Sequence, residues 1–295
     1  MRPILLLVTL LATLSLTAQR TRLLLDADTA NEIDDLYAIA YLFDEQSVDW
    51  VGLTSAQWFH QFSGDSTVYR SQALNAQLLR AADRLDLPHP IGADSIMGMP
   101  WGGYDPRDSP AARFIIEQAR AAGPEKLTVV CIGASTNLAS ALALAPDITE
   151  QVRAYVLGFQ YDAERAVWNK DEFNIRRDLN AANYLLNAEG LELHVMPTST
   201  AIRYQFDRDS TFARLGHAGP VGVVLRERWQ SFAPDASRWT MWDVALLQAI
   251  LTPAQATEID VTTPPENVQR SIRLYSDIDA EAMAHDYWTR LTHDE

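Results

Sequence analysis

The sequence predicts an α/β fold, an open and mostly parallel sheet flanked by helices. Short apolar runs alternate with amphipathic helical patterns along most of the chain, which is typical of successive βαβ units. Hydrophobic residues make up 47% of the composition, so a chain of this length can bury a large core. No linker rich in Pro, Gly or Ser divides the sequence, and we therefore expect one domain over residues 20–295.

The expected elements follow one another in strand and helix order. Each predicted strand is a short apolar run, and several predicted helices begin at a capping residue. In chain order they are a strand at 22–25, a helix after Asp34, a strand at 48–54, a long helix in which Leu74, Leu78 and Leu85 share a face, a strand at 90–93, a helix opened by Ser109 and Pro110, a strand at 127–132, a helix at 138–144, a strand at 152–158, a helix from Asp178 to near Gly190, a strand at 191–196, helices at 220–232 and 242–251, and a last helix from about Asp279. Ligands of such sheets bind beyond the carboxyl ends of the strands, so polar residues just after each strand are the first candidates for a site.

The first nineteen residues have the pattern of a signal peptide. Arg2 precedes an apolar run from Ile4 to Leu16, and the small residue Ala18 lies near a plausible cleavage point. The run is too short for a resident membrane span, although an uncleaved anchor is the alternative interpretation. We therefore expect an exported protein, periplasmic or secreted, and leave residues 1–19 out of the fold.

The chain is acidic and has one cysteine. Its formal net charge of −15 would become −16 without Arg2, the one charged residue of the leader. This charge disfavours a nucleic acid polymer as partner and favours a small neutral or cationic ligand. Cys131 lies in an apolar run and is expected to be buried, and a lone cysteine excludes a disulfide framework within the chain. The sequence leaves the oligomeric state open, a homo-oligomer included.

Four carboxylates are expected to crowd together beyond the first strand. The strand runs directly into Asp26 and Asp28, and the next helix opens on Asp34 and Asp35. A helix N-terminus stabilises negative charge by only about 0.3–1 kcal/mol, too little to hold so many unpaired acids side by side. A cation is therefore expected among them, and the alternative is a single aspartate cap with the other acids solvated.

The residue types indicate a hard cation. Carboxylate oxygens are the donors that Ca²⁺ and Mg²⁺ prefer, and the sequence has no His and Cys cluster that would favour a softer metal. Calcium tolerates irregular coordination better than magnesium, so we expect Ca²⁺. Chemistry alone leaves Mg²⁺ open.

Four segments resemble those of a known family and occur in the same order. They are L-L-D-A-D at 24–28 with N-E-I-D-D at 31–35, I-G-A-S-T-N-L at 132–138, D-E-F-N-I at 171–175 followed by Asp178, and W-D at 242–243, where the family pattern has H-D. They cover most of the mature chain, which thus resembles a divergent nucleoside hydrolase. The resemblance implies a nucleoside hydrolase-like fold and hydrolysis of the bond between ribose and a nucleobase or related group.

Carried over residue by residue, the resemblance implies a Ca²⁺ site and a general base. The ligands would be Asp28, Asp35, Asp243 and the backbone carbonyl of Thr136. Asp28 would also be the base, because Ca²⁺ is a modest Lewis acid and the attacking water needs a carboxylate to take its proton. Asp26 is expected to organise the loop instead.

The resemblance also implies ribose contacts from Asp34, Glu172 and Asn174. Carboxylate and amide groups that grip a diol orient the sugar and can stabilise an oxocarbenium-like transition state. Asn169 is a further candidate, although its spacing to Glu172 is shorter than in the family pattern. The alternative for Asn169 is an ordinary loop asparagine.

The chain departs from the family pattern after the strand at 48–54. The family has an asparagine near the sugar there, whereas this chain has S-A-Q-W-F-H at 55–60. Gln57 could substitute for it, and Trp58 or Phe59 could either stack on a base or be buried. Three stretches punctuated by Gly and Pro, at 98–110, 161–170 and 206–220, are candidates for lids.

Trp242 is the second departure. It occupies the place of a family histidine thought to protonate the departing base, and an indole N–H does not titrate in the useful range. Either another residue supplies the proton, with His60, Arg203 and Tyr204 as candidates, or the leaving group scarcely needs one.

Two other function classes stay open. The D-x-D at Asp26 and Asp28 also resembles the nucleophile motif of Mg²⁺-dependent phosphohydrolases, but Ala30 and the lack of a later lysine and acid set argue against that class. A non-catalytic nucleoside- or ribose-binding protein is the other alternative, because Trp242 replaces the expected acid.

Overall fold

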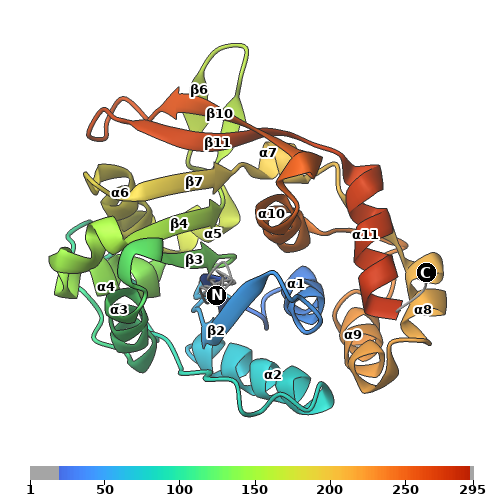
Figure 1. Ribbon diagram of the computed structural model, residues 1–295. Helices are drawn as coiled ribbons and strands as arrows, with labels where there is room; N and C mark the ends of the chain where they lie inside the picture. Colours follow the sequence, from blue (N-terminus) through green and yellow to red (C-terminus); the bar gives the residue numbers. More distant parts are fainter. Residues whose placement is uncertain (1–19, 293–295) are drawn as a thin grey trace, which may run out of the picture.

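The structure is a computed structural model that describes residues 20–292, so the predicted signal peptide lies outside the described residues. Its centre is a seven-stranded sheet. The strands are β1 (Thr21–Ala27), β2 (Val48–Ser55), β3 (Leu127–Cys131), β4 (Val152–Leu157), β7 (Glu192–Met196), β10 (Ala256–Thr262) and β11 (Ser271–Ile278). Their order is β10-β11-β7-β4-β3-β1-β2, and every neighbouring pair except the antiparallel β10 and β11 is parallel (Figure 1). The predicted α/β fold with a mostly parallel sheet is confirmed.

Helices cover both faces of the sheet (Figure 1). One face carries α3 (Pro110–Ala121), α4 (Thr136–Leu144) and α6 (Leu179–Asn187). The other carries α1 (Asp34–Leu42) and α10 (Trp242–Leu251), with α8 (Arg208–Leu215), α9 (Gly219–Phe232) and α11 (Ala280–Thr292) packed outside them and α2 (Thr67–Ala81) alongside β2. Within residues 20–292, no helix has the length and apolar character that a membrane crossing requires.

Short elements lie beyond the carboxyl ends of the central strands. Helix α5 (Phe173–Arg177) follows β4, and helix α7 (Thr198–Ala201) follows β7. Two antiparallel ribbons accompany them, β5 (Gln160–Asp162) with β6 (Val167–Asn169), and β8 (Gln205–Asp207) with β9 (Arg238–Thr240). The sequence patterns did not predict these ribbons, because each strand has only three residues.

Two predicted helix starts are confirmed by their caps. Ser109 Oγ accepts a hydrogen bond from the Ala112 N–H at 3.1 Å, and Asp178 Oδ1 accepts one from the Ala181 N–H at 2.9 Å. Such a side-chain cap satisfies an N–H that has no partner within the helix. Helix α10 begins at Trp242, the position that its apolar pattern predicted.

Three sequence expectations differ from the structure. Helix α2 ends at Ala81, so Leu85 lies outside it and is 44% exposed. Residues 90–93 do not form a strand but pair with the sheet through a single bridge between Ser55 and Ile91, since Pro90 has no N–H for a ladder. The strands β10 and β11 were not predicted, because apolar and polar residues alternate along both of them and neither forms a continuous apolar run.

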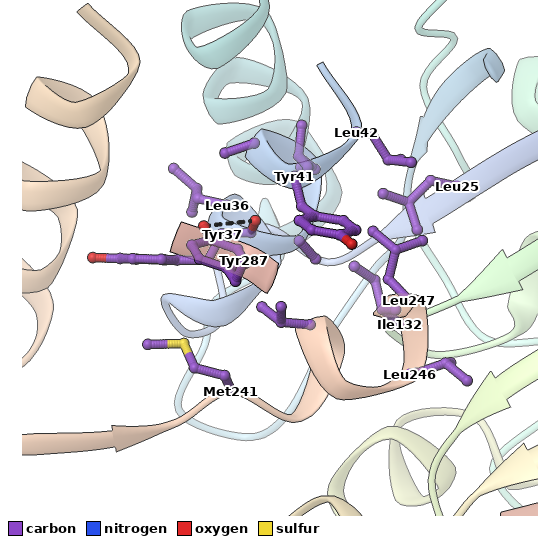
Figure 2. Close-up of a cluster of buried hydrophobic side chains, with 14 of the residues drawn as sticks. Leu25, Leu36, Tyr37, Tyr41, Leu42, Ile132, Met241, Leu246, Leu247 and Tyr287 are labelled. Carbon is purple, nitrogen blue, oxygen red and sulfur yellow. Dashed lines mark hydrogen bonds between the residues drawn. The ribbon is translucent and has the colours of Figure 1, made fainter. Parts of the chain in front are cut away.

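One hydrophobic cluster fixes α1 against α10. Tyr37 and Tyr41 of α1 lie beside Tyr287 of α11, and the Tyr41 and Tyr287 rings stack with centroids 5.7 Å apart (Figure 2). Leu246 and Leu247 of α10 fill the same cluster, and the Tyr287 hydroxyl donates to the Tyr37 carbonyl at 3.1 Å. All nine residues of α1 are buried, which is typical of a helix enclosed on every side. This packing sets the position of the acidic first turns of α1 and α10.

Candidate active site

The carboxyl ends of the central strands open into a cavity of about 600 Å³. Its walls come from the segment after β1, the first turns of α1 and α10, the segment before and within α5, and helix α7. Seven carboxylates line it: Asp28, Glu32, Asp34, Asp35, Asp171, Glu172 and Asp243. Among residues 20–292, no Lys, Arg or His side chain contributes to this lining.

Three of these carboxylates form a compact group. Asp34, Asp35 and Asp243 are buried, and each has an oxygen within 4.8 Å of an oxygen of the others. Asp34 Oδ2 also accepts a hydrogen bond from the Asp243 N–H at 3.1 Å. The first turns of α1 and α10, 209 residues apart in sequence, are thereby joined at the site.

Burial and mutual repulsion destabilise the charged forms of these acids. Burial, and then the charge of Asp34, raises the pKa of Asp35 to about 8. Burial, and then the charges of Asp35 and Glu32, raises the pKa of Asp28 well above its usual range. The pKa of Asp243 is raised in the same way, by burial and then by Asp34. A positive charge among these acids would favour their ionised forms.

The donor atoms suit a hard divalent cation. Asp28 Oδ2 and Asp35 Oδ1 are buried and accept no hydrogen bond from any residue that the structure describes. Buried carboxylate oxygens without a partner are costly, and a cation that prefers oxygen ligands would satisfy them. Of the four acids predicted to crowd together, Asp28, Asp34 and Asp35 line the cavity, whereas Asp26 does not.

The structure brings only some of the predicted metal ligands together in the compact group. The compact group contains Asp35 and Asp243 as predicted, but its third member is Asp34, which was assigned to the sugar. Asp28 lies next to this group, and its charge interacts with Asp34 and Asp35. Thr136 is buried at the start of α4 and does not line the cavity, and its hydroxyl donates to Asp178 at 2.7 Å. Its backbone carbonyl is the atom that the prediction concerns.

The Asp28 side chain lies close against the backbone at Gly133. A Cβ atom added at Gly133 would lie 2.8 Å from Asp28 Cβ and Cγ and 2.9 Å from Oδ1. No side chain fits between the segments that follow β1 and β3, so glycine at this position lets the carboxylate approach the strand end.

Asp26 has the structural role that was expected for it. Its Oδ1 accepts hydrogen bonds from the Thr54 hydroxyl at 2.6 Å and from Asn137 Nδ2 at 2.9 Å. Asn137 Nδ2 also donates to the Ser55 carbonyl at 3.0 Å. These bonds tie β1, β2 and α4 together beneath the cavity, and Asp26 does not line it.

Arg228 of α9 organises the loop between Asp28 and Asp34. Its Nε donates to the Glu32 carbonyl at 2.9 Å, and its second terminal nitrogen donates to the Ala30 carbonyl at 2.8 Å. The guanidinium also offers positive charge to the acids, since it opposes the rise in the pKa of Asp35. No sequence signal identified this residue, because it lies 196 positions after Glu32.

Glu172 and Asn174 lie in the cavity wall, where a sugar contact requires them. Glu172 caps α5, its Oε2 accepting from the Ile175 N–H at 3.1 Å, and burial raises its pKa. Asn174 Nδ2 donates to the Ile132 carbonyl at 2.9 Å and the Leu157 carbonyl at 3.3 Å. These bonds leave the amide oxygen of Asn174 as the atom available to a ligand.

Asn169 lies outside the cavity lining, on the exposed strand β6. Its Nδ2 donates to Gln160 Oε1 at 3.1 Å, and Gln160 is the residue that lines the cavity. Asn169 therefore contacts a residue of the cavity wall, Gln160, that the sequence did not single out.

The segment after β2 does not supply the missing sugar contact. Gln57 is fully buried, and its amide donates to Thr136 Oγ1 at 3.3 Å and the Arg177 carbonyl at 3.1 Å. Its oxygen accepts from the Phe59 N–H at 2.7 Å. Neither Gln57, Trp58 nor Phe59 lines the cavity. Gln57 therefore does not take the proposed place of the sugar contact in this cavity. Trp58 is buried, which is the second of the two roles expected for it, and Phe59 is exposed outside the cavity.

Trp242 and helix α7 form the remaining wall. α7 packs against α10, and Thr198, Ser199 and Ile202 line the cavity together with Trp242. Thr198 and Ser199 follow β7, where polar residues after a strand are expected in a site.

None of the three candidate proton donors reaches the cavity. His60 lines a different cavity, Arg203 pairs with Asp277 at 2.5 Å, and the buried Tyr204 hydroxyl donates to Gln248 at 2.7 Å. The candidate lid at 206–220 is also wrong, because it contains α8, which packs against α9 and α11 away from the cavity.

Comparisons with known proteins agree with this architecture. The family model described as inosine-uridine preferring nucleoside hydrolase matches residues 23–290. A curated relative, probable uridine nucleosidase 2 of Arabidopsis thaliana, is 29% identical over 223 residues. That alignment covers 67% of this chain and 66% of the relative, slightly less than two thirds of the relative's length.

Solved structures share the fold. A plant nucleoside hydrolase superposes with a TM-score of 0.73 at 18% identity, over 93% of this chain and 99% of that chain. An inosine-guanosine nucleoside hydrolase gives 0.73 at 14% identity, over 94% and 99%. The type III effector protein XopQ, complexed with adenosine diphosphate ribose, gives 0.67 at 17% identity, over 93% of both chains. The predicted nucleoside hydrolase-like fold is confirmed.

The family match covers nearly the whole described chain, including every segment that carries the sequence resemblance. The chain belongs to the inosine-uridine preferring nucleoside hydrolase family, a family of N-glycoside hydrolases.

Proposed function

We propose that this protein hydrolyses the N-glycosidic bond of a ribonucleoside or related riboside, with Ca²⁺ bound, and releases ribose and the free base. The proposal rests on one observation: the compact acid group, Glu172 and Asn174 all line the same cavity. A metal-ligating group and sugar-binding groups are thereby within reach of one small ligand.

The relatives support nucleosides as the substrate class and leave the base open. The curated relative is named as a uridine nucleosidase, and one structural neighbour is named as an inosine-guanosine nucleoside hydrolase. Pyrimidine and purine nucleosides both occur in these names, so our proposal does not choose between them.

Asp28 is the general base in this proposal. A water molecule attacks the anomeric carbon, and Asp28 accepts its proton while the bond to the base nitrogen breaks and its electrons leave with the base. Gly133 allows the Asp28 carboxylate to lie at the strand end. Asp28 and the neighbouring Asp35 are both buried. Glu172 and the Asn174 amide oxygen would hold the ribose hydroxyls and so orient the anomeric carbon.

The cation would be held by Asp34, Asp35 and Asp243, with Asp28 and the Thr136 carbonyl as the further ligands that the resemblance implies. A divalent cation supplies positive charge that makes water more acidic and offsets the repulsion among the acids. Calcium is our choice because the ligands are carboxylate and carbonyl oxygens from separate segments, in which irregular geometry is expected.

One experiment tests both the reaction and the metal. Inosine, uridine and other nucleosides are incubated with the protein, with and without a chelator, and reducing sugar is measured. We expect ribose release that chelation abolishes and added Ca²⁺ restores, and we expect Asp35→Ala to lose bound calcium and activity together. Full activity after exhaustive chelation, or full calcium occupancy in Asp35→Ala, would contradict the proposal. Release of inorganic phosphate from phosphate esters would instead indicate the phosphohydrolase alternative.

A second candidate function is binding without turnover. Trp242 replaces the histidine of the family pattern. No histidine among the residues that the structure describes lines the cavity. The effector XopQ, a structural neighbour, is named as a complex with adenosine diphosphate ribose. Calorimetry that shows nucleoside or ribose binding, with no reducing sugar formed on prolonged incubation, would favour this candidate.

We also propose that the protein is exported, as the pattern of residues 1–19 indicates. The mass of the mature protein, purified after expression with its leader, is the test. Loss of about nineteen residues supports cleavage by a signal peptidase, and an intact N-terminus contradicts it.

A further inference from the structure

A second cavity of about 970 Å³ adjoins the candidate active site. Phe173 of α5 lines both cavities. The ion pair between Arg176 and Asp171, 3.0 Å long, spans the boundary, since Arg176 lines the second cavity and Asp171 lines the first. The two cavities are therefore neighbours around the short helix α5.

Four aromatic side chains around the second cavity are exposed. Trp101 is 84% exposed and Phe62 is 83% exposed, while Phe59 and Tyr104 are each 45% exposed. Isolated exposed aromatics are ordinary, but a concentration of them around one hollow indicates a surface that contacts something.

The turn that carries Trp101 is fastened to its surroundings. Met99 and Gly102 exchange two backbone hydrogen bonds across it, at 3.0 and 2.9 Å. Asn180 Nδ2 donates to the carbonyls of Met97 and Met99 at 2.7 and 2.8 Å, which ties the turn to α6. The indole is therefore presented from a fixed backbone, so a ligand that stacks on it loses little affinity to ordering the protein.

Two arginines give this cavity a charge opposite to that of the active site. The Arg177 guanidinium lies 4.6 Å from the Phe173 ring centre and donates to the Phe59 carbonyl at 3.3 Å. Its Nε is buried and has no hydrogen-bond partner among residues 20–292. Asp178 is the one carboxylate that the described residues add to this lining, and both of its oxygens already accept hydrogen bonds from the protein.

We propose that this aromatic-arginine cavity, lined by Phe59, Phe62, Trp101, Tyr104, Arg176 and Arg177, is a second binding site for the anionic, aromatic part of a nucleotide. A base would stack on the exposed rings, and a phosphate would pair with the arginines, whose planar groups match phosphate oxygens. The proposal goes beyond the proposed function, because it concerns binding and does not depend on turnover.

Charge directs the phosphate to this cavity rather than to the active site. Seven carboxylates line the active-site cavity, and no basic side chain among the described residues belongs to that lining; Arg228 and Arg176 compensate part of the negative charge from outside it. Like charges in a cleft repel an anion, and the arginines next to it attract the same anion. A ligand with a ribose and a phosphate-linked aromatic group would satisfy both cavities at once.

The test uses adenosine 5′-monophosphate as the probe, titrated into the whole protein in a calorimeter at low ionic strength. The cavity variants are Trp101→Ala and Arg176→Gln. Their matched controls are Tyr69→Ala, an aromatic residue that is 56% exposed on α2, and Arg120→Gln, from an exposed ion pair with Asp147 that is also 3.0 Å long. We expect each cavity variant to weaken binding about fivefold or more, and the controls to leave it unchanged.

Three outcomes would overturn the proposal. The first is an absence of binding, or an affinity that neither cavity variant changes. The second is binding that Asp34→Ala abolishes while Trp101→Ala does not, which would place the probe in the active-site cavity. The third is a dimer in sedimentation that Trp101→Ala dissociates with no change in probe affinity, which would make this surface a contact between copies. Thermal unfolding checks that both cavity variants are folded, and ribose release from nucleosides, measured separately, tests the proposed function alone.

Discussion

Replacement of Gly133 by alanine should disable the site while leaving the fold intact. The added Cβ would lie 2.8 Å from Asp28 Cβ and Cγ, whereas ordinary van der Waals contact begins at 3.4 Å. One of the two groups must therefore move by about 0.6 Å, the difference between these distances. The Gly133 side is restrained, because the preceding Ile132 N–H donates to the Asp26 carbonyl at 2.9 Å and the Ile132 carbonyl accepts from Asn174. Asp28 is consequently the group that shifts.

A shift of this size is large for a general base and small for a fold. Misplacement of a reacting group by about 1 Å can cost on the order of 10²-fold in rate, so we expect kcat/KM of Gly133→Ala to fall by about 10- to 100-fold. Overpacking in a buried region costs about 1–3 kcal/mol, which a protein of this size tolerates.

The assay is ribose release at saturating Ca²⁺, with urea unfolding measured on the same sample. Gly216→Ala is the matched control: Gly216 ends α8 with φ −59° and lies outside the cavity, and the nearest atom to its added Cβ is the Ala213 carbonyl oxygen at 3.3 Å. Its activity should equal that of the unmodified protein. If Gly133→Ala were folded and within threefold of normal kcat/KM, the contact with Asp28 would have no catalytic importance and the assignment of Asp28 as base would lose its structural support.

Three further changes test other parts of the site and fold. Asp28→Asn should keep the fold and lose at least about 10²-fold in kcat, because an amide cannot accept the proton of the attacking water; a loss of less than tenfold would place the base elsewhere. Since Trp242 cannot donate a proton, nitrophenyl or pyridinium ribosides should be cleaved at least about 10²-fold faster than inosine, and Trp242→His should narrow that gap. Equal kcat/KM on both kinds of substrate in the unmodified protein would show that the cavity has a proton donor. Although burial alone would raise it, hydrogen bonds from Arg153 and Lys126 lower the pKa of Glu192 from 4.5 to about 2. A carboxylate whose pKa is lower in the folded than in the unfolded protein stabilises the fold at pH values above its unfolded pKa, and this stabilisation is lost as the pH falls toward 2. The Glu192 side chain is about one-third exposed, which weakens the effect. Glu192→Gln should therefore lower the free energy of unfolding by about 1–2 kcal/mol at pH 7, and by progressively less below pH 4.5, as measured by urea unfolding. A destabilisation that did not change with pH would exclude this ionic origin.

Most strands of the sheet and most of the helices that cover it were predictable because their signals are local, whereas β10 and β11 were not. The apolar run before Asp26, the Ser109 and Asp178 caps and the apolar α10 pattern each lie within a few residues of the element that they define. The crowding of Asp28, Asp34 and Asp35 was predictable for the same reason, since a strand end and the following helix start are close in the chain. The expected metal centre rested on this local crowding.

The tertiary structure decided which distant side chains meet. Arg228 reaches the loop after Asp28 from a helix almost two hundred residues later, and the Asp243 N–H donates to Asp34 across a similar separation. Nothing near Arg228 in the sequence marks it, because its partners are backbone carbonyls and any loop could supply them.

Packing also determined which of the predicted residues line the cavity. Gln57 has the right chemistry for a sugar contact, but its amide and oxygen are both occupied by neighbouring groups. Asn169 lies outside the lining and contacts Gln160, whose place in the wall depends on how the ribbon after β4 folds back. Sequence determines the elements and the chemistry available at their ends, because propensity and capping act over short range. Which of those groups face a ligand depends on side-chain packing between elements far apart in the chain, and only the folded structure specifies that packing.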